Sequence, residues 1–203
     1  MKNILALSFI LLLCSFLSPL AQAQKKQALF DGKTLAGWHT IPGGKWEVKD
    51  KTIVGKNTKA DNRHGLLVSD KQYSDFTVSL QYKAVKGNSG FYFRVQETGD
   101  EVGVKGFQAE IDPDKDAGGL YETSGRAWVV QPKPEDVKTW YKPNEWNTMT
   151  IKAVGGNITV TVNGKTSAQL TNDTGLRKGH FALQLHGGQD VEVMFRDITL
   201  AGK

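Results

Sequence analysis

The sequence predicts an all-β protein, a β-sandwich in which two antiparallel sheets pack face to face. Many short segments alternate apolar and polar residues, which is the period-two pattern of half-buried strands. Twenty-two glycines are spread along the chain and separate these segments, as turns do in such folds. The chain shows no long helical window, no repeat of fixed period and no linker, so a single domain is expected.

The first 23 residues have the pattern of a secretory signal peptide. A lysine near the start precedes an apolar run over 4–17, and residues 21–23 form a small-x-small cleavage site. The run is shorter than a membrane-spanning helix requires, so no membrane span is expected. Cys14 follows a leucine rather than a small residue, which favours plain export over a lipid anchor. Residues 24–203 are then the mature domain, in the periplasm, at the cell surface or outside the cell.

Composition indicates which classes of partner are not expected and which interactions stabilise the fold. The predicted leader holds one of the 26 basic residues and none of the 21 acidic ones, so the mature domain carries a net charge of +4. The basic residues are scattered and do not interleave with aromatic ones, so nucleic acid is not expected as a partner. Cys14 is the sole cysteine, so the mature domain is expected to depend on its core rather than on disulfides.

The N-terminal half is predicted to contain a turn, a hairpin and then longer strands. Asp31-Gly32 is a turn signal between apolar residues, and Asp50-Lys51 separates two short strands. A polar loop over 56–64 follows this hairpin. The apolar or alternating segments of this half are predicted as strands over 46–48, 52–55, 66–68, 76–82 and 91–95.

The next predicted strand, over 107–112, has an unusual polar face. Its alternation gives one apolar face, made of Phe107, Ala109 and Ile111, and one polar face, made of Gln108, Glu110 and Asp112. Surface strands ordinarily carry Lys, Thr and Ser on the wet side, whereas this strand carries an amide and two carboxylates. Such side chains can bind a sugar, hold a metal or move a proton.

The C-terminal half is predicted to hold hairpins after an irregular stretch. Residues 132–142 are expected to be irregular, with one helical turn, and Asn163-Gly164 is a strong two-residue hairpin signal. The apolar or alternating segments of this half are predicted as strands over 127–130, 148–153, 158–162, 180–186 and 191–200.

Three strands carry polar faces that can form one site. If these strands are neighbours in one sheet, their outward side chains gather, namely Tyr92, Arg94, Gln108, Glu110, Asp112, Gln184 and His186. A patch of this kind on a bent sheet is where jelly rolls bind saccharides. The structural alternative is an ion pair of Arg94 with Glu110 or Asp112 that only stabilises the sheet. The coincidence across three strands favours a site.

A metal is a further alternative at this patch. Asp112, Asp114 and Asp116 have the spacing that opens an EF-hand loop, but Ala117 and Thr123 stand where that loop needs Gly and Glu. A solvated acidic turn is therefore favoured there. A divalent metal in the cleft stays open, with ligands from Asp112, Glu110 and His186.

Other catalytic schemes lack their residues. The mature domain has no cysteine nucleophile and no Gly-x-Ser-x-Gly elbow, and no histidine pair has the spacing of a zinc-binding helix. His64 lies in the predicted polar loop, which could border the cleft, but a surface histidine is the favoured interpretation.

Several motifs together resemble the 3-keto-disaccharide hydrolase domain family. Their order and spacing carry the resemblance over nearly the whole mature chain, in the segments 29–38, Asn88-Ser89-Gly90 with Arg94, Gln108-x-Glu110-x-Asp112, Gly119-x-Tyr121, Glu145-Trp146-Asn147, Asn163-Gly164, 179–187 and 195–198. The resemblance implies a concanavalin-like jelly roll, export, and action on glycosides whose C3 hydroxyl has been oxidised to a ketone.

The residues of the patch suit the chemistry that this resemblance implies. A ketone at C3 makes the C2 proton acidic, so a base can remove it and the C1 oxygen can leave by β-elimination, with water adding afterwards. Glu110 or His186 is assigned as base, and Arg94, or a metal on Asp112, as stabiliser of the enolate. Tyr121 or a second carboxylate is assigned as acid. The residues expected to bind the saccharide are Tyr92, Gln108, Tyr121 and Gln184.

Three alternatives stay open. Glu110 and a second carboxylate could hydrolyse ordinary glycosides directly. A lectin-like module could bind a saccharide in the same cleft without turnover. A structural adhesion domain would have no binding pocket.

Overall fold

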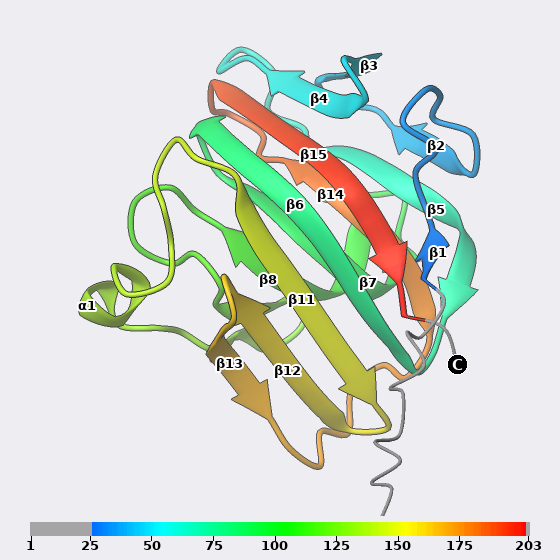
Figure 1. The fold of residues 1–203 in the computed structure, drawn as a ribbon. Helices are drawn as coiled ribbons and strands as arrows, with labels where there is room; N and C mark the ends of the chain where they lie inside the picture. The colour runs from blue at the N-terminus through cyan, green and yellow to red at the C-terminus, as the bar shows by residue number, and fades with distance from the viewer. Residues whose placement is uncertain (1–25, 202–203) are drawn as a thin grey trace, which may run out of the picture.

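The computed structural model describes residues 26–201 and shows a sandwich of two antiparallel sheets with almost no helix (Figure 1). The predicted signal peptide over 1–23, with Cys14, lies outside the described residues. The predicted all-β class and the two-sheet architecture are confirmed. No helix within residues 26–201 is long and apolar enough to cross a membrane.

The first sheet, at the front in Figure 1, is built around two long neighbouring strands. Its order is β13 (Lys165–Leu170), β12 (Asn157–Val162), β11 (Asn147–Val154), β6 (Phe76–Lys86), β15 (Val191–Leu200), β4 (Thr52–Asn57) and β3 (Lys45–Lys49), and β1 (Gln27–Ala28) pairs with β15. The predicted hairpins are confirmed as β3–β4 and β11–β12. Asn163 and Gly164 join β12 to β13, both with positive φ (51° and 82°), as a tight hairpin turn requires.

The second sheet lies behind the first and carries the polar strands. Its order is β10 (Ala127–Val130), β9 (Leu120–Thr123), β8 (Val104–Ile111), β7 (Ser89–Glu97), β14 (Gly179–Leu185), β5 (Gly65–Tyr73) and β2 (Trp38–Ile41). The three strands with unusual polar faces are therefore direct neighbours, in the order β8-β7-β14, as expected. The predicted helical turn is α1 (Pro134–Val137), which stands out beside the sandwich (Figure 1).

Aromatic side chains fill the space between the two sheets. Phe76 of β6 meets Phe181 of β14 edge-on, with ring centroids 4.8 Å apart, and meets Phe93 of β7 at 5.9 Å. Each of these residues is one of the apolar positions of an alternating strand, so its side chain points inward. The alternation therefore sends the intervening polar residues of β7, β8 and β14 to the outer face of the second sheet.

A bulge in β7 breaks this alternation at Arg94. Arg94 has φ of 53°, and the register of β7 against β8 shifts between Phe93 and Gln96. Val95, expected beside Phe91 and Phe93, instead packs with Tyr92 on the outer face. The expectation that Tyr92 and Arg94 share a face is therefore wrong, because the extra residue of the bulge reverses the side-chain direction beyond it.

Glycines on both neighbouring strands make room for this bulge. A Cβ on Gly179 of β14 would lie 2.4 Å from the carbonyl carbon of Arg94, and one on Gly106 of β8 would lie 2.9 Å from its oxygen. Any other residue at either position would push against the bulged backbone.

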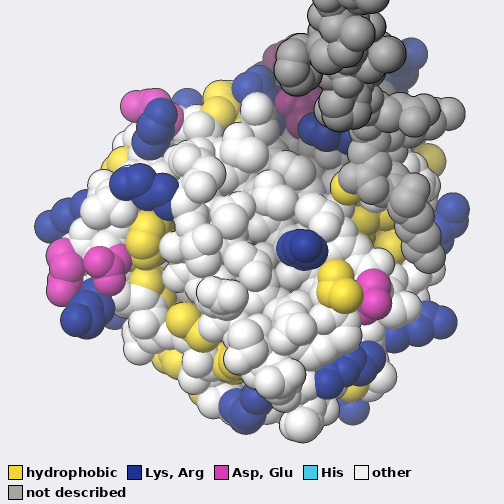
Figure 2. Space-filling view, turned by 60° about the horizontal axis from the view of Figure 1, so that its bottom comes forward, with side chains coloured by type: hydrophobic (Ala, Val, Ile, Leu, Met, Phe, Trp, Pro, Cys, Tyr) yellow, Lys and Arg dark blue, Asp and Glu magenta, His cyan; other side chains and the backbone are white. Residues whose placement is uncertain are grey.

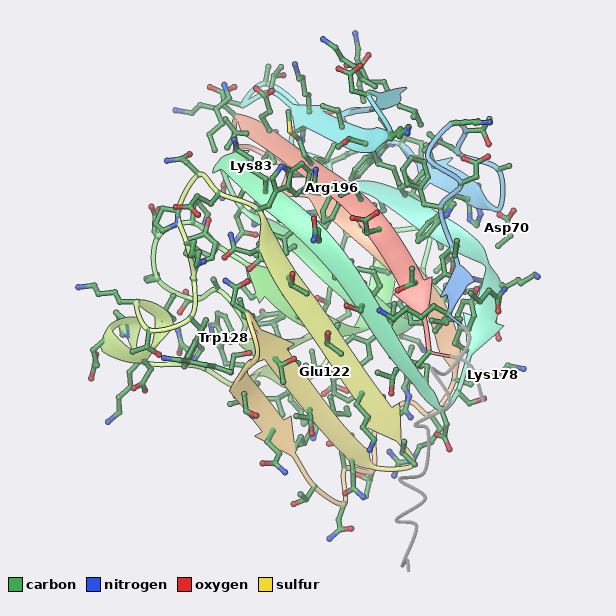
Figure 3. All side chains as sticks on the ribbon, in the orientation of Figure 1. Asp70, Lys83, Glu122, Trp128, Lys178 and Arg196 are labelled. Atoms are coloured by element: carbon green, nitrogen blue, oxygen red, sulfur yellow. The ribbon has the colours of Figure 1, made fainter. Side chains whose placement is uncertain are left out.

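Charged side chains are spread over the surface. On the face shown in Figure 2, Lys and Arg side chains are scattered among acidic and hydrophobic ones rather than gathered into one patch. Figure 3 shows the outer face of the front sheet, where Arg196 of β15 lies over the ring of Trp146, with its guanidinium carbon 3.9 Å from the ring centroid.

His39 links three strands of the second sheet and makes stability depend on pH. Its Nδ1 lies 2.8 Å from Asp70 of β5, and its Nε2 lies 3.1 Å from Glu97 of β7. The hydrogen bond to Asp70, and then the one to Glu97, raises the pKa of His39 against the opposing effect of burial. Because the folded pKa is raised, this contribution is complete below the unfolded pKa and is lost as pH rises through the folded one.

We expect His39→Gln to lower Tm at about pH 5.5 by roughly 1–2 °C and to leave Tm unchanged at about pH 9. The effect is small because all three side chains are partly exposed. Asp70→Asn is the companion variant and should show the same pH dependence in thermal melts. An equal loss at both pH values would contradict this ion-pair account.

Candidate active site

A hollow of about 350 Å³ lies on the outer face of the second sheet, a volume typical of small-molecule sites. Its lining combines polar, aromatic and imidazole side chains from five strands and the adjoining loops: His64, Asn88, Tyr92, Val102, Gln108, Glu110, Tyr121, Thr123, Ser124, Trp128, Gln184 and His186. The patch expected from the polar strand faces is therefore a concave site.

Strand register brings the central residues of the hollow together. Tyr92 of β7 is paired with Gln108 of β8 on one side, and with Ala182 of β14 on the other. Gly90 is paired with Glu110. Residues paired across adjacent strands lie on the same face, and every second residue returns to that face. Gln184 follows Ala182 by two positions and so joins the site.

The floor of the hollow is a closed hydrogen-bond network of buried polar side chains. Gln108 Nε2 donates to Gln184 Oε1 (3.2 Å), and Gln184 Nε2 donates to the hydroxyl of Tyr92 (3.2 Å). Tyr92 shares a hydrogen bond with Thr123 (3.0 Å), whose hydroxyl lies 3.5 Å from Gln108 Oε1. These groups hold one another in place, so the floor is organised before any ligand arrives.

Glu110 is a buried carboxyl at the centre of this network, with only 5% of its surface exposed. Asn88 donates to its Oε1 at 2.5 Å, and Gln108 donates to its Oε2 at 2.8 Å. Burial raises the pKa of Glu110 to about 8, with smaller upward effects from Asp112 and Asp116, and the bond from Asn88 opposes them. A carboxyl of this kind holds its proton at neutral pH and can give it to a reacting group.

Gly90 is needed for this arrangement. A Cβ at position 90 would lie 2.5 Å from Gln108 Nε2, so any side chain there would displace the amide that bonds Glu110. Gly90 therefore allows the side chain of Gln108 to lie close to the backbone of β7.

An aromatic wall closes one side of the hollow. Tyr121 of β9 and Trp128 of β10 are paired across the strands, and their rings meet edge-on with centroids 5.3 Å apart. Both side chains are half-buried, and Trp128 is labelled in Figure 3. Exposed aromatic faces beside acids and amides are suited to a ligand that is apolar on one side and rich in hydroxyls on the other.

Two histidines from separate loops complete the lining. His64 precedes β5 and His186 follows β14, and their rings meet edge-on with centroids 4.5 Å apart. Burial, and then the neighbouring His186, lowers the pKa of His64, so this imidazole is neutral at physiological pH.

Six of the eight predicted site residues lie in this hollow. They are the residues from the strand faces and the following segments, namely Tyr92, Gln108, Glu110, Tyr121, Gln184 and His186. The sequence analysis did not assign six others to the site: His64, interpreted as a surface histidine, Asn88, interpreted as part of a turn, and Val102, Thr123, Ser124 and Trp128. The alternation of β9 and β10 could have indicated Thr123 and Trp128, because Thr123 shares a face with Tyr121.

Arg94 lies away from the hollow. Its side chain is fully buried and donates to backbone carbonyls of Ser74 (2.9 and 3.0 Å), Gly155 (2.8 Å) and Leu176 (3.4 Å). Its contact with a carboxylate is to Asp75, at 3.4 Å, rather than to Glu110 or Asp112. Its assignment as stabiliser of an enolate is therefore not supported by its position.

Asp112 also lies outside the lining of the hollow. Its Oδ1 accepts the backbone N–H groups of Asp114 (2.6 Å) and Lys115 (3.4 Å), so it stabilises the acidic turn that follows β8. Within residues 26–201, no three or more acidic, histidine or cysteine side chains are grouped so that they could hold a metal ion. The possible metal set that the sequence left open, Asp112, Glu110 and His186, is therefore not assembled within the described residues.

Comparison with solved structures finds the same sandwich fold in several other proteins. A candidate glycosyl hydrolase from Parabacteroides distasonis superposes with a TM-score of 0.65 at 20% identity, over 88% of this chain and 94% of that one. The carbohydrate-binding module CBM66 from Bacillus subtilis gives 0.63 at 19% identity, over 82% and 96%. A Bacillus subtilis protein described as galectin-like gives 0.54 at 13% identity, over 81% and 88%. These similarities show a shared jelly-roll fold.

Comparison of the sequence with protein families gives a match over residues 25–201, which is most of the chain. No curated protein matches the sequence. The resemblance predicted from the sequence is confirmed, and the all-β sandwich that it implies agrees with the structure. The chain belongs to the family of 3-keto-alpha-glucoside-1,2-lyase-like domains.

Proposed function

We propose that this protein is exported and cleaves glycosides that carry a ketone at C3, by elimination across C1 and C2. The observation that carries the proposal is the buried carboxyl of Glu110, with its pKa raised to about 8, in a hollow that also contains His186. The family description supports the substrate and the bond that is cleaved. The aromatic wall of Tyr121 and Trp128 supports a sugar ring as the ligand.

The reaction needs a base and an acid. The base removes the C2 proton, and the electron pair of the C2–H bond forms an enolate with the C3 ketone. This pair then forms the C1=C2 double bond, the C1–O bond breaks, and the ketone is restored. The departing oxygen takes a proton from the acid, and water can add to the resulting enone to complete a net hydrolysis.

The surroundings of the two groups support a division of these roles. His186 is the base, because its imidazole lines the hollow beside Glu110 and can receive a proton. Glu110 is the acid, because burial keeps its proton in place until about pH 8. The sequence analysis left the base open between these two residues, and the raised pKa of Glu110 favours the acid role.

The amide and hydroxyl groups of the floor orient the substrate. Gln108, Gln184, Tyr92 and Thr123 are hydrogen-bonded to one another, and all four line the hollow. Sugar hydroxyls donate and accept, so they can join such a network without leaving its groups unpaired. The orientation that results determines which ring carbon lies near the two proton-transfer groups.

The test is an assay of the purified protein on an alkyl 3-keto-α-glucoside and on its unoxidised parent, with products followed by NMR. We expect release of the alcohol and formation of the enone or its hydrate from the keto-sugar alone. Equal cleavage of the unoxidised glucoside would instead support direct hydrolysis by two carboxylates, and would overturn the elimination.

A binding module is the second candidate. The structural similarity to CBM66 and the aromatic wall are the observations that favour it. Binding can be measured by NMR titration of the protein with saccharides. Saturable binding, with no product after prolonged incubation, would replace the enzymatic proposal with this one.

A further inference from the structure

The two histidines are held next to each other by bonds between their loops. Asn57, buried at the end of β4, donates from its side-chain amide to the carbonyl of Arg63 (3.3 Å) and to that of His186 (3.1 Å). The backbone N–H of Gly188 donates to the carbonyl of Asp61 at 2.7 Å. Hydrogen bonds thus connect the segments around both histidines, so the fold itself fixes the edge-on contact of the two imidazoles.

The peptide groups of Gly187 determine the tautomer of both rings, that is, which ring nitrogen carries the hydrogen. Its N–H donates to Nδ1 of His64 (3.3 Å), and its carbonyl lies 2.7 Å from Nδ1 of His186. The side-chain amide of Gln184 also donates to Nδ1 of His64 (3.2 Å). A nitrogen that accepts hydrogen bonds cannot carry a hydrogen, so neutral His64 carries its hydrogen on Nε2. A nitrogen facing a carbonyl must donate, so neutral His186 carries its hydrogen on Nδ1.

The two imidazoles are therefore complementary. His64 offers an Nε2–H donor and His186 offers an Nε2 lone pair, and both rings line the same hollow. The His64 ring also has a backbone hydrogen bond with Leu185, which has a small upward effect on its pKa. Within residues 26–201, Nε2 of His186 makes no hydrogen bond, and neither Nε2 atom is a buried atom without a partner. A ligand in the hollow therefore competes with the Leu185 backbone at His64 and meets an unoccupied lone pair at His186.

We propose that His64 Nε2–H donates a hydrogen bond to the C3 oxygen of the substrate and holds it as the enolate forms, while His186 Nε2 receives the C2 proton. This inference rests on the proposed function and assigns the role that Arg94 cannot fill. The C2–H bond breaks, its proton goes to His186, its electron pair becomes the C2=C3 bond, and the negative charge collects on the C3 oxygen. His64 keeps its hydrogen throughout.

A neutral donor suits this role. The positive charge that His186 gains would repel a protonated neighbour, whereas neutral His64 can remain at 4.5 Å. A fixed N–H aimed at the place where charge develops lowers the barrier without reorganisation, and removal of one such donor typically costs about 10²–10³-fold in rate.

The test separates enolate formation from loss of the leaving group. The probe is a 3-keto-1,5-anhydroglucitol, which has the ketone and the C2 hydrogen but no group to expel at C1. Incubation in D₂O with the wild-type protein should replace the C2 hydrogen by deuterium, as seen by NMR. We expect His64→Ala to slow this exchange about 10²–10³-fold.

Two further variants guard against misfolding and indirect effects. His64→Gln keeps an acceptor for Gly187 and an N–H donor, and should recover exchange roughly tenfold over His64→Ala. His39→Ala, which removes a histidine far along the sheet, should exchange at the wild-type rate. If the wild-type protein exchanges the C2 hydrogen and a folded His64→Ala variant does so at the same rate, the inference is wrong and the proposed function stands. Absence of exchange in the wild-type protein would overturn both.

Discussion

Glu110→Gln is expected to lower kcat on the 3-keto-glucoside by roughly 10³-fold, because the amide cannot give a proton to the departing oxygen. The replacement keeps the shape of the side chain and an oxygen that can accept from Asn88 or Gln108. Substrate affinity should therefore change little, and kcat should carry the loss. In the wild-type protein, kcat should fall as pH rises through about 8, where Glu110 loses its proton.

The same variant should be more stable than the wild-type protein at alkaline pH. Between the unfolded pKa of about 4.5 and the folded pKa of about 8, the folded state holds a proton that the unfolded state releases. Folding stability therefore falls as pH rises through this window, and the full cost remains above it. Glu110→Gln removes this cost, so its Tm should exceed that of the wild-type protein by about 5 °C at about pH 9 and match it at about pH 4.

Glu47→Gln is the matched control, because Glu47 is exposed on β3 in the other sheet. It should keep wild-type activity and the wild-type dependence of Tm on pH. A Glu110→Gln protein that retains full activity, or melts at the wild-type temperature at every pH, would contradict the assignment of Glu110 as a buried acid.

Arg94→Met is expected to destabilise the fold by about 3 kcal/mol and to lower Tm by about 10 °C. The methionine keeps an apolar stem but leaves the carbonyls of Ser74 and Gly155 without their buried donor. Hydrogen bonds from a charged, buried donor contribute more to stability than neutral ones, and their loss is the physical source of the effect. Denaturant unfolding at constant pH measures it.

Activity of Arg94→Met distinguishes its structural position from the catalytic role expected from the sequence. Assayed well below its Tm, the variant should keep kcat within a few-fold of the wild-type value, because the guanidinium lies outside the hollow. Arg196→Met makes the same chemical change on the outer face of the front sheet and should cost less than about 1 kcal/mol. A fall in kcat of about 10²-fold or more in folded Arg94→Met would restore Arg94 to the reaction.

The sequence by itself determined the strands, the sandwich and most of the site. Side chains alternate with a period of two along β8 and along β14 from Ala182 onward, so the outward positions of Gln108, Glu110 and Gln184 follow from the order of residues alone. Turn signals such as Asn163-Gly164 likewise act locally and could be recognised without tertiary information. The family motifs then pointed to the same strands.

Tertiary structure alone decided the position of Arg94 and the pairing of His64 with His186. The bulge at Arg94 is accommodated by glycines on two neighbouring strands, and sequence alternation cannot show a register shift that depends on partners. His64 and His186 are 122 positions apart in the sequence. The side-chain amide of Asn57 holds their loops together, and the peptide groups of Gly187 orient their rings. Contacts between distant loops depend on how the whole chain packs, so the ring that completes the site could not be predicted from its local sequence.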